Sequence, residues 1–180
     1  MGKMFEQIQE AHMDFINQQK MFFVATAGDD TSVNLSPKGM DSFRVIDAYK
    51  VVWLNLTGSG NETAAHLLEN NRMTIMFCAF EGNPLILRLY GTAKALYKGD
   101  EKWNNYIKIF GNPIGARQIF EVAIQRVQTS CGFGVPLYQY DQQRTLLPQW
   151  AEKKGPDGIN EYWEKKNMQT IDGKPTGMKT

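Results

Sequence analysis

The residues between 51 and 69 have the clearest potential for chemistry, because a glycine-rich loop joins a strand-forming run to a helix-forming run. Val51–Leu56 is apolar and β-prone, Thr57–Thr63 contains two glycines, and Ala64–Glu69 favours a helix. Backbone N–H groups at the start of a helix attract phosphate, and glycines let a phosphate approach the backbone closely. The pattern predicts a phosphate-binding loop, although an ordinary capped turn into a helix fits the same residues.

The side chains of this loop suit the same interpretation. Asn61 fits the position that caps a helix, Glu62 fits the first helical turn, and Asn61 and Thr63 would add side-chain donors. No Lys-Ser/Thr pair follows the glycines, which excludes a Walker-type nucleotide loop. The glycine spacing likewise excludes a Rossmann fingerprint.

A second candidate is the segment Asn34–Gly39. Lys38 could bring a positive charge to a phosphate, and Ser36 a hydroxyl. Pro37 lacks a ladder donor, which indicates an edge strand or a bulge that leaves backbone groups free for a planar ligand. An edge strand with an exposed lysine explains the segment equally simply.

Two further residues are candidates for function on weaker grounds. Arg88 lies in an alternating apolar strand pattern, where a charge requires either a ligand or a salt-bridge partner. Cys131 stands in a segment with two glycines around Phe133, which indicates close backbone approach. A reactive thiol and a structural thiol are both consistent with this position.

The sequence identifies no catalytic nucleophile and no metal site. A Gly-x-Ser-x-Gly nucleophile elbow is absent from the sequence. His12 and His66 are the only histidines, which excludes a multi-histidine metal site, and Cys78 and Cys131 are not spaced with them as in a zinc finger. We therefore expect no metal and assign no catalytic residue.

Composition narrows the class of protein. The chain has 180 residues, 42% apolar and 22% charged, which suits one ordinary domain with its own core. A formal net charge of +1 does not indicate binding to nucleic acid or to an anionic membrane. Two cysteines cannot form a disulfide scaffold, and the N-terminus has no apolar signal region. These features predict a cytoplasmic protein with no membrane span.

Periodicity predicts the elements of the first half. A three- and four-residue apolar spacing predicts a helix over residues 3–19. Met21–Ala27 and Ser32–Lys38 predict a hairpin around a Gly-Asp-Asp turn. Residues 47–50 predict another turn, before the strand Val51–Leu56.

The second half predicts further strands, then helices. Strands are expected over 73–79 and 85–97, a helix over 100–110, and a short helix over 117–120 ahead of a strand over 122–130. Residues 145–153 and 159–166 favour helices. The expected fold is a single α+β domain over 1–180, mainly β, around a small barrel-like antiparallel sheet, with 137–180 as a C-terminal helical extension.

Taken together, these segments resemble the pyridoxamine 5′-phosphate oxidase-like flavoproteins, the FMN-binding split β-barrel family. The resemblance rests on Val33–Gly39, Val51–Leu67, Met73–Phe77 and Leu87–Ala93, in the order strand, strand, phosphate loop and helix, strand, long strand. Ser130–Pro136 with the later Arg144 and Trp150 is similar to one bacterial branch of that family.

The resemblance implies a cofactor, a partner and a set of site residues. Two chains would form a homodimer with FMN in a groove at their interface. The implied FMN-binding residues are Ser36, Lys38, Leu54, Asn55, Leu56, Asn61, Glu62, Thr63 and Arg88. Phe133, Tyr138 and Trp150 are candidates to stack on the flavin ring.

The departures from the family pattern leave the activity open. Basic residues usually open the helix in the oxidase branch, whereas this chain has Asn61-Glu62-Thr63-Ala64 there, and Glu62 would lie close to a dianion. The Arg-x-His substrate signature is absent as well. An FMN-dependent oxidoreductase of unknown substrate is the first hypothesis. A non-catalytic protein that stores or senses flavin, deazaflavin or haem is the second, and a flavin-free interaction module is the third.

Overall fold

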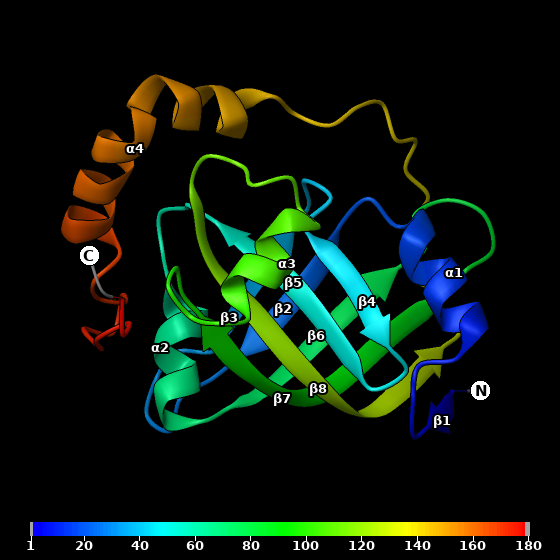
Figure 1. The fold of residues 1–180 in the computed structure, drawn as a ribbon. Helices are drawn as coiled ribbons and strands as arrows, with labels where there is room; N and C mark the ends of the chain where they lie inside the picture. The colour runs from blue at the N-terminus through cyan, green and yellow to red at the C-terminus, as the bar shows by residue number, and fades with distance from the viewer. Residues whose placement is uncertain (1, 179–180) are drawn as a thin grey trace.

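The computed structural model describes residues 2–178 as a curved sheet with helices packed at its ends (Figure 1). Met1, Lys179 and Thr180, which the expected 1–180 domain includes, lie outside the described residues. The elements in chain order are β1 (Lys3–Phe5), α1 (Glu10–Gln18), β2 (Phe22–Thr26), β3 (Asn34–Lys38), β4 (Phe43–Asp47), β5 (Lys50–Leu56), α2 (Glu62–Glu69), β6 (Arg72–Cys78), β7 (Ile86–Leu96), α3 (Trp103–Lys108), β8 (Ala116–Ser130) and α4 (Leu146–Lys166).

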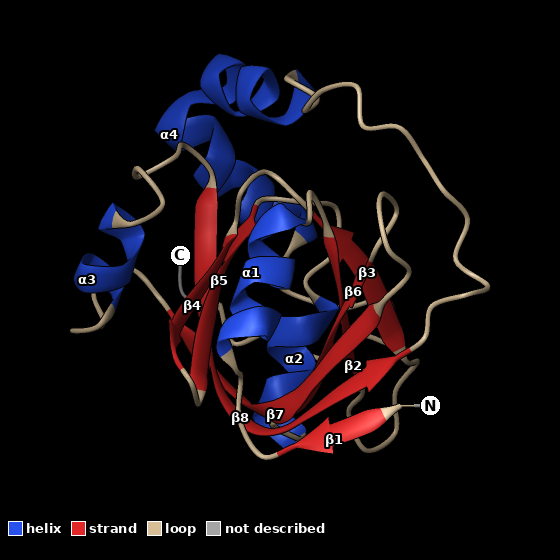
Figure 2. Cartoon of the chain, turned by 90° about the vertical axis from the view of Figure 1, so that its right-hand side faces the viewer, coloured by secondary structure: helices blue, strands red, loops and turns tan. Residues whose placement is uncertain are grey.

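The strands form one antiparallel sheet that curls without closing. Its order is β3-β2-β6-β7-β8-β5-β4, and β1 pairs with β8 beside this path. Figure 2 looks along the curled sheet, and Figure 1 shows α1 and α2 at its two opposite ends. This arrangement confirms the expected α+β, mainly β, split barrel of antiparallel strands. β3 lies at one end of the order, which explains how Pro37 is accommodated without a backbone donor.

The interior of the curved sheet is filled by alternate side chains of its strands. Trp53 on β5 is fully buried and stacks on Phe120 of β8, with ring centroids 4.5 Å apart. Ile75 of β6 and Leu87 of β7 are also fully buried in the same cluster. Burial of each such side chain stabilises the fold by about 1.5–3 kcal/mol. Because Trp53 and Phe120 pack on each other, their burial stabilises the pairing of β5 with β8.

The structure corrects two expectations in the regions where strand pairing outweighs helix periodicity. Residues 3–19 do not form one helix, because Lys3–Phe5 pairs with β8 and the helix begins only at Glu10. Residues 117–120 are not helical either. They belong to β8, which pairs with β5 on one side and β7 on the other.

Two smaller differences concern the strand before β5 and the last helix. The sequence did not predict β4, which pairs with β5 in the register Phe43↔Trp53. The two helices expected over 145–153 and 159–166 are the halves of α4. Gly155 has a non-helical backbone with φ of 64° between them, and Pro156 follows it.

The chain after β8 consists of a long irregular segment, the helix α4 and a C-terminal tail that packs against the sheet. Residues 131–145 cross the molecule without regular structure and lead into α4 (Figure 1). Beyond α4, Ser32 donates to the Asp172 carboxylate from its backbone N and its hydroxyl, at 3.0 and 2.9 Å, and Lys174 pairs with Glu69 at 2.9 Å. The tail, residues 167–178, is thus held against the β2–β3 loop and α2 by these contacts. Among residues 2–178, no helix has the length and apolar character needed to cross a membrane.

A glycine substitution tests the contact between β7 and β8. Gly91 lies at a register shift in β7, and a Cβ there would collide with the Ala123 backbone carbonyl. Gly91→Ala should therefore lower the free energy of unfolding by about 1–3 kcal/mol in urea denaturation. Gly134→Ala is the control, because open space surrounds Gly134, and it should change stability by less than about 0.5 kcal/mol. Equal effects of the two changes would contradict this account of the sheet.

Candidate functional site

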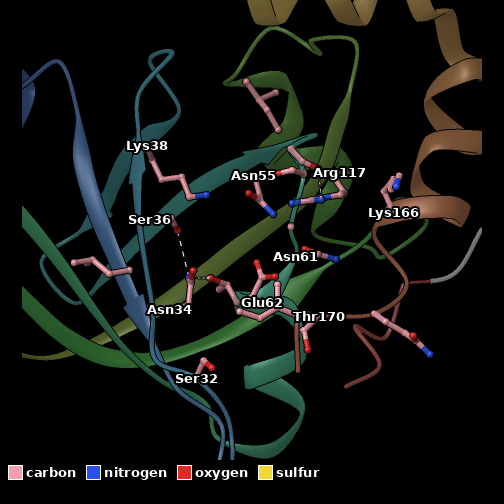
Figure 3. A pocket seen from close by; sticks show the side chains of 18 of the residues that line it. Ser32, Asn34, Ser36, Lys38, Asn55, Asn61, Glu62, Arg117, Lys166 and Thr170 are labelled. Carbon is pink, nitrogen blue, oxygen red and sulfur yellow. Dashed lines mark hydrogen bonds between the residues drawn. The ribbon is translucent and has the colours of Figure 1, made fainter. Parts of the chain in front are cut away.

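A cavity of about 680 Å³ lies where strands, a helix N-terminus and the C-terminal segment meet (Figure 3). Its walls come from β3, the end of β5, the loop 58–60, the start of α2, Arg117 on β8 and residues 166–171. Strand pairing places β5 directly beside β8, while the hydrogen bonds of the tail hold residues 166–171 near α2. Segments distant in sequence therefore form one polar cavity.

Positive charge dominates the cavity. Its charged lining side chains within the described part of the chain are Lys38, Arg117, Lys166 and one carboxylate, Glu62. In Figure 3 the Lys38 and Arg117 side chains point toward each other, and the Glu62 carboxylate points up between them. Three cations against one carboxylate favour an anionic ligand.

Burial perturbs both of the inner cations. Burial lowers the pKa of Arg117 to about 10, and Glu62 partly opposes this. Burial, reinforced by the charge of Arg117, lowers the pKa of Lys38 to about 8. The Lys38 ammonium lies 5.4 Å from the centroid of the Trp53 ring. Both cations would be stabilised by an anion that enters the cavity.

Arg117 is held by neutral acceptors. Its Nε donates to Oε1 of Gln118 at 3.1 Å, and Nη1 donates to Oδ1 of Asn167 at 2.6 Å. The amide of Asn55 donates to the same Gln118 oxygen at 2.8 Å. These bonds fix the guanidinium, and no carboxylate of residues 2–178 forms an ion pair with it.

The N-terminus of α2 presents unpaired polar groups to the cavity. Asn61 stands at the capping position, as the sequence predicted, but its side chain makes no cap hydrogen bond. It is 3% exposed, and both its Nδ2 and Oδ1 are buried without a hydrogen-bond partner in the described chain. Buried unpaired polar atoms are destabilising, and a ligand at the cavity wall would relieve them.

Hydroxyl and amide groups continue along the wall toward β3. Asn34 Nδ2 donates to Thr63 Oγ1 at 3.2 Å and to Ser36 Oγ at 3.3 Å. Beyond them, the exposed apolar side chains of Val33 and Leu35 line the cavity mouth. The donor set fits FMN: the cations and the helix N-terminus suit its phosphate, the hydroxyl and amide groups its polyol chain, and the apolar residues its ring.

The cavity brings together seven of the residues that the sequence suggested for FMN: Ser36, Lys38, Asn55, Leu56, Asn61, Glu62 and Thr63. Leu54 points elsewhere, into an apolar cluster that includes Val52 and Trp103, and it lines a separate cavity of about 200 Å³. Arg88 lies outside the cavity lining and donates to Ser130 Oγ at 3.2 Å. Their assignments to FMN remain predictions.

The candidate stacking residues do not line this cavity within one chain. Phe133 is 81% exposed. Tyr138 packs against Phe80, and Trp150 packs against Tyr162.

Both cysteines are free, with Cys131 exposed. Within residues 2–178 no group of His, Cys, Asp and Glu side chains could hold a metal ion.

Sequence reasoning missed Arg117, Lys166 and the tail residues 169–171. Arg117 was placed in an expected helix, so its position beside the phosphate loop went unseen. A usable signal existed, because Phe120, Val122 and Ile124 alternate with a period of two and β-prone Ile119 precedes them, which favours a strand that begins close to Arg117. No local signal indicated the tail, since its position depends on long-range hydrogen bonds.

The lowered pKa of Lys38 has a measurable consequence for stability. Between pH 8 and 10.5 the unfolded chain retains a Lys38 proton that the folded protein has lost, so this group makes the folded state more stable as pH rises. In urea denaturation, the free energy of unfolding of the wild type relative to Lys38→Met should increase across this window, by less than about 1.4 kcal/mol per pH unit. A flat difference would contradict a half-buried lysine with a lowered pKa.

Comparisons with known proteins agree with the fold. Residues 8–131 match the sequence profile of the family described as pyridoxamine 5′-phosphate oxidase. A pyridoxamine 5′-phosphate oxidase family protein of Aspergillus flavus, ustO, is 35% identical over 189 residues, which cover 95% of this chain and 76% of that protein.

Solved structures share the fold at lower identity. HupZ of Group A Streptococcus has a TM-score of 0.56 at 23% identity, covering 67% of this chain and 91% of that chain. An FMN-binding protein from Syntrophomonas wolfei has a TM-score of 0.50 at 15% identity, covering 71% of this chain and 84% of its own. The profile match and the fungal relative show that the chain belongs to the pyridoxamine 5′-phosphate oxidase family.

Proposed function

We propose that the protein is an FMN-dependent oxidoreductase whose flavin phosphate binds between Arg117, Lys38 and the N-terminus of α2. The observation that carries this proposal is the Asn61 side chain, buried and unpaired beside two perturbed cations. Bound FMN would supply the redox chemistry, and this chain's residues would bind and orient it. Family membership and an FMN-binding structural relative support the choice of cofactor.

Each wall of the cavity has a proposed role toward FMN. Lys38, Arg117 and Lys166 would balance the phosphate charge, assisted by the free N–H groups that open α2. Ser36 and Asn55 would contact the polyol chain. Glu62 would weaken binding, because its carboxylate lies among the cations that the phosphate needs.

We also propose that the FMN site is completed by a second copy of this chain. Val33 and Leu35 are 74% and 62% exposed on and beside the edge strand β3, where they line the open side of the cavity. A partner chain would bury these apolar side chains and shield the flavin from water. Residues 1–180 would then act as one FMN-binding domain, with the extension 137–180 contributing a cavity wall.

The donor set favours flavin over haem at this cavity. Neither histidine lines it. His12 Nδ1 accepts a hydrogen bond from the Gln9 backbone, and His66 Nδ1 lies 3.0 Å from Thr26 Oγ1. The visible absorption spectrum of protein incubated with FMN and desalted tests this directly. A retained flavin band supports the proposal, and a colourless protein overturns it.

The charge pattern predicts how FMN affinity responds to substitution. Lys38→Ala and Arg117→Met should each raise the dissociation constant for FMN about tenfold or more, because each removes a cation from the phosphate site. Thr63→Ala should also weaken binding, through loss of a hydroxyl. Glu62→Gln should tighten binding, since it removes the opposing carboxylate. Quenching of FMN fluorescence measures all four constants.

The control for this series is Lys94→Ala, which removes an exposed lysine of β7 outside the cavity. It should leave FMN affinity unchanged. If the Lys38 and Lys94 variants weaken FMN equally, the effect is one of net charge, and the proposed phosphate site is wrong.

The proposed homodimer gives a separate prediction. The wild type should sediment as a dimer in analytical ultracentrifugation. Leu35→Asp should shift it toward monomer and weaken FMN binding together, because a carboxylate would be buried at the interface. A wild type that is monomeric yet retains FMN tightly would contradict the shared site.

A further inference from the structure

Asn167 links the buried cation of the cavity to the glycine loop. It is fully buried and comes directly after α4. Its Oδ1 accepts from Arg117 Nη1 at 2.6 Å, while its Nδ2 donates to the backbone carbonyls of Gly58 at 3.0 Å and Ser59 at 3.4 Å. One amide thus orients two of the groups proposed to surround an anion.

The Gly58 and Ser59 carbonyls determine where the loop's donors point. In a trans peptide the C=O and N–H groups point in opposite directions. Because Asn167 holds these two carbonyls toward itself, the N–H groups of Ser59 and Gly60 point away from it. Neither N–H has a hydrogen-bond partner among residues 2–178. Both residues line the cavity, so their N–H groups are available to an anion there.

The tail after α4 holds Asn167 in place. The Asn167 backbone N donates to the Trp163 carbonyl at 2.8 Å. Its backbone carbonyl accepts from Thr176 Oγ1 at 2.6 Å, and Thr176 is fully buried. The Trp163 indole donates to Thr57 Oγ1 at 2.9 Å, which fixes α4 beside the glycine loop. Asn167 is therefore positioned by two segments that contain no proposed phosphate ligand except Lys166.

We infer that Asn167 is a positioning residue that makes the site selective for phosphorylated over unphosphorylated flavin. This inference rests on the proposed function and adds to it the residue through which the site would distinguish FMN from riboflavin. Without Asn167, Arg117 loses its shortest hydrogen bond, the Ser59 carbonyl loses its donor, and the Gly58 carbonyl keeps only the 3.5 Å bond from Arg117 Nη1. The carbonyls are then free to turn toward the cavity and repel a phosphate. The flavin ring and polyol chain would keep their own contacts.

FMN and riboflavin separate this role from general stability, because they share the ring and polyol chain and differ in the phosphate. Dissociation constants for both ligands are measured for wild type and Asn167→Ala, together with urea unfolding. Asn167→Ala should weaken FMN about tenfold while changing riboflavin by less than about twofold. Asn160→Ala, an exposed asparagine of the same helix, is the matched control and should change neither.

Thr176→Val provides a second variant in case Asn167→Ala does not fold. It keeps the side-chain shape, removes the hydroxyl that holds the Asn167 carbonyl, and should lower the FMN-to-riboflavin preference in the same direction. A third measurement needs no variant. In the wild type, FMN but not riboflavin should slow hydrogen exchange at the Ser59 and Gly60 amides.

The outcomes distinguish this inference from the proposed function. A folded Asn167→Ala protein that keeps the wild-type preference for FMN overturns the inference and leaves the FMN site standing. Equal losses for FMN and riboflavin, or equal exchange protection by both, overturn it as well. A wild type that binds neither flavin overturns the proposed function and this inference with it.

Discussion

The guanidinium of Arg117 is the group on which the arrangement of the site depends. It is 5% exposed, and the partners that bond it are Gln118, Asn167 and the Gly58 carbonyl, all uncharged. A buried charge is costly to keep away from water unless its donors are satisfied. The surrounding segments supply acceptors for its Nε and Nη1 groups: β5 supplies Asn55 to hold Gln118, and the residue after α4 supplies Asn167. The net positive charge left over points to an anionic ligand.

The hydrogen bonds of the Arg117 guanidinium connect three parts of the chain that are distant in sequence. The strand β8 carries it between β5 and β7, the loop 58–60 lies beside it, and the tail covers it. The tail is in turn held by Thr176, Lys174 and Asp172, which bond residues of three different segments. The cavity is thus built by long-range contacts around a local phosphate-loop pattern. The C-terminal extension therefore forms part of the cavity wall in addition to its part in packing.

Glu62 and Lys38 contribute charges of opposite sign to the same cavity. Burial and the charge of Arg117 lower the pKa of Lys38, and the charge of Glu62 partly opposes them. The chain therefore pairs a helix N-terminus that attracts phosphate with a carboxylate that opposes it. In the proposed phosphate site, cations from β3, β8 and α4 would take the place of the basic residues that usually open this helix in the oxidase branch. Under the proposed function, this charge from elsewhere would offset Glu62 at a helix that opens with Asn-Glu-Thr.

Several local elements could be predicted from the residues alone: the hairpin of β2 and β3, the strand β5 with its glycine loop and α2, and an edge strand or bulge at Pro37. These follow from periodicity, turn residues and backbone restrictions that act within a few residues. Only the tertiary structure decided that Lys3–Phe5 and Arg117–Phe120 are strands, because strands distant in sequence supply their hydrogen-bond partners. It also decided that Leu54 points away from the cavity and that Asn167 meets Arg117 across 50 residues. Such contacts depend on which surfaces the folded sheet brings together, and no local pattern contains that information.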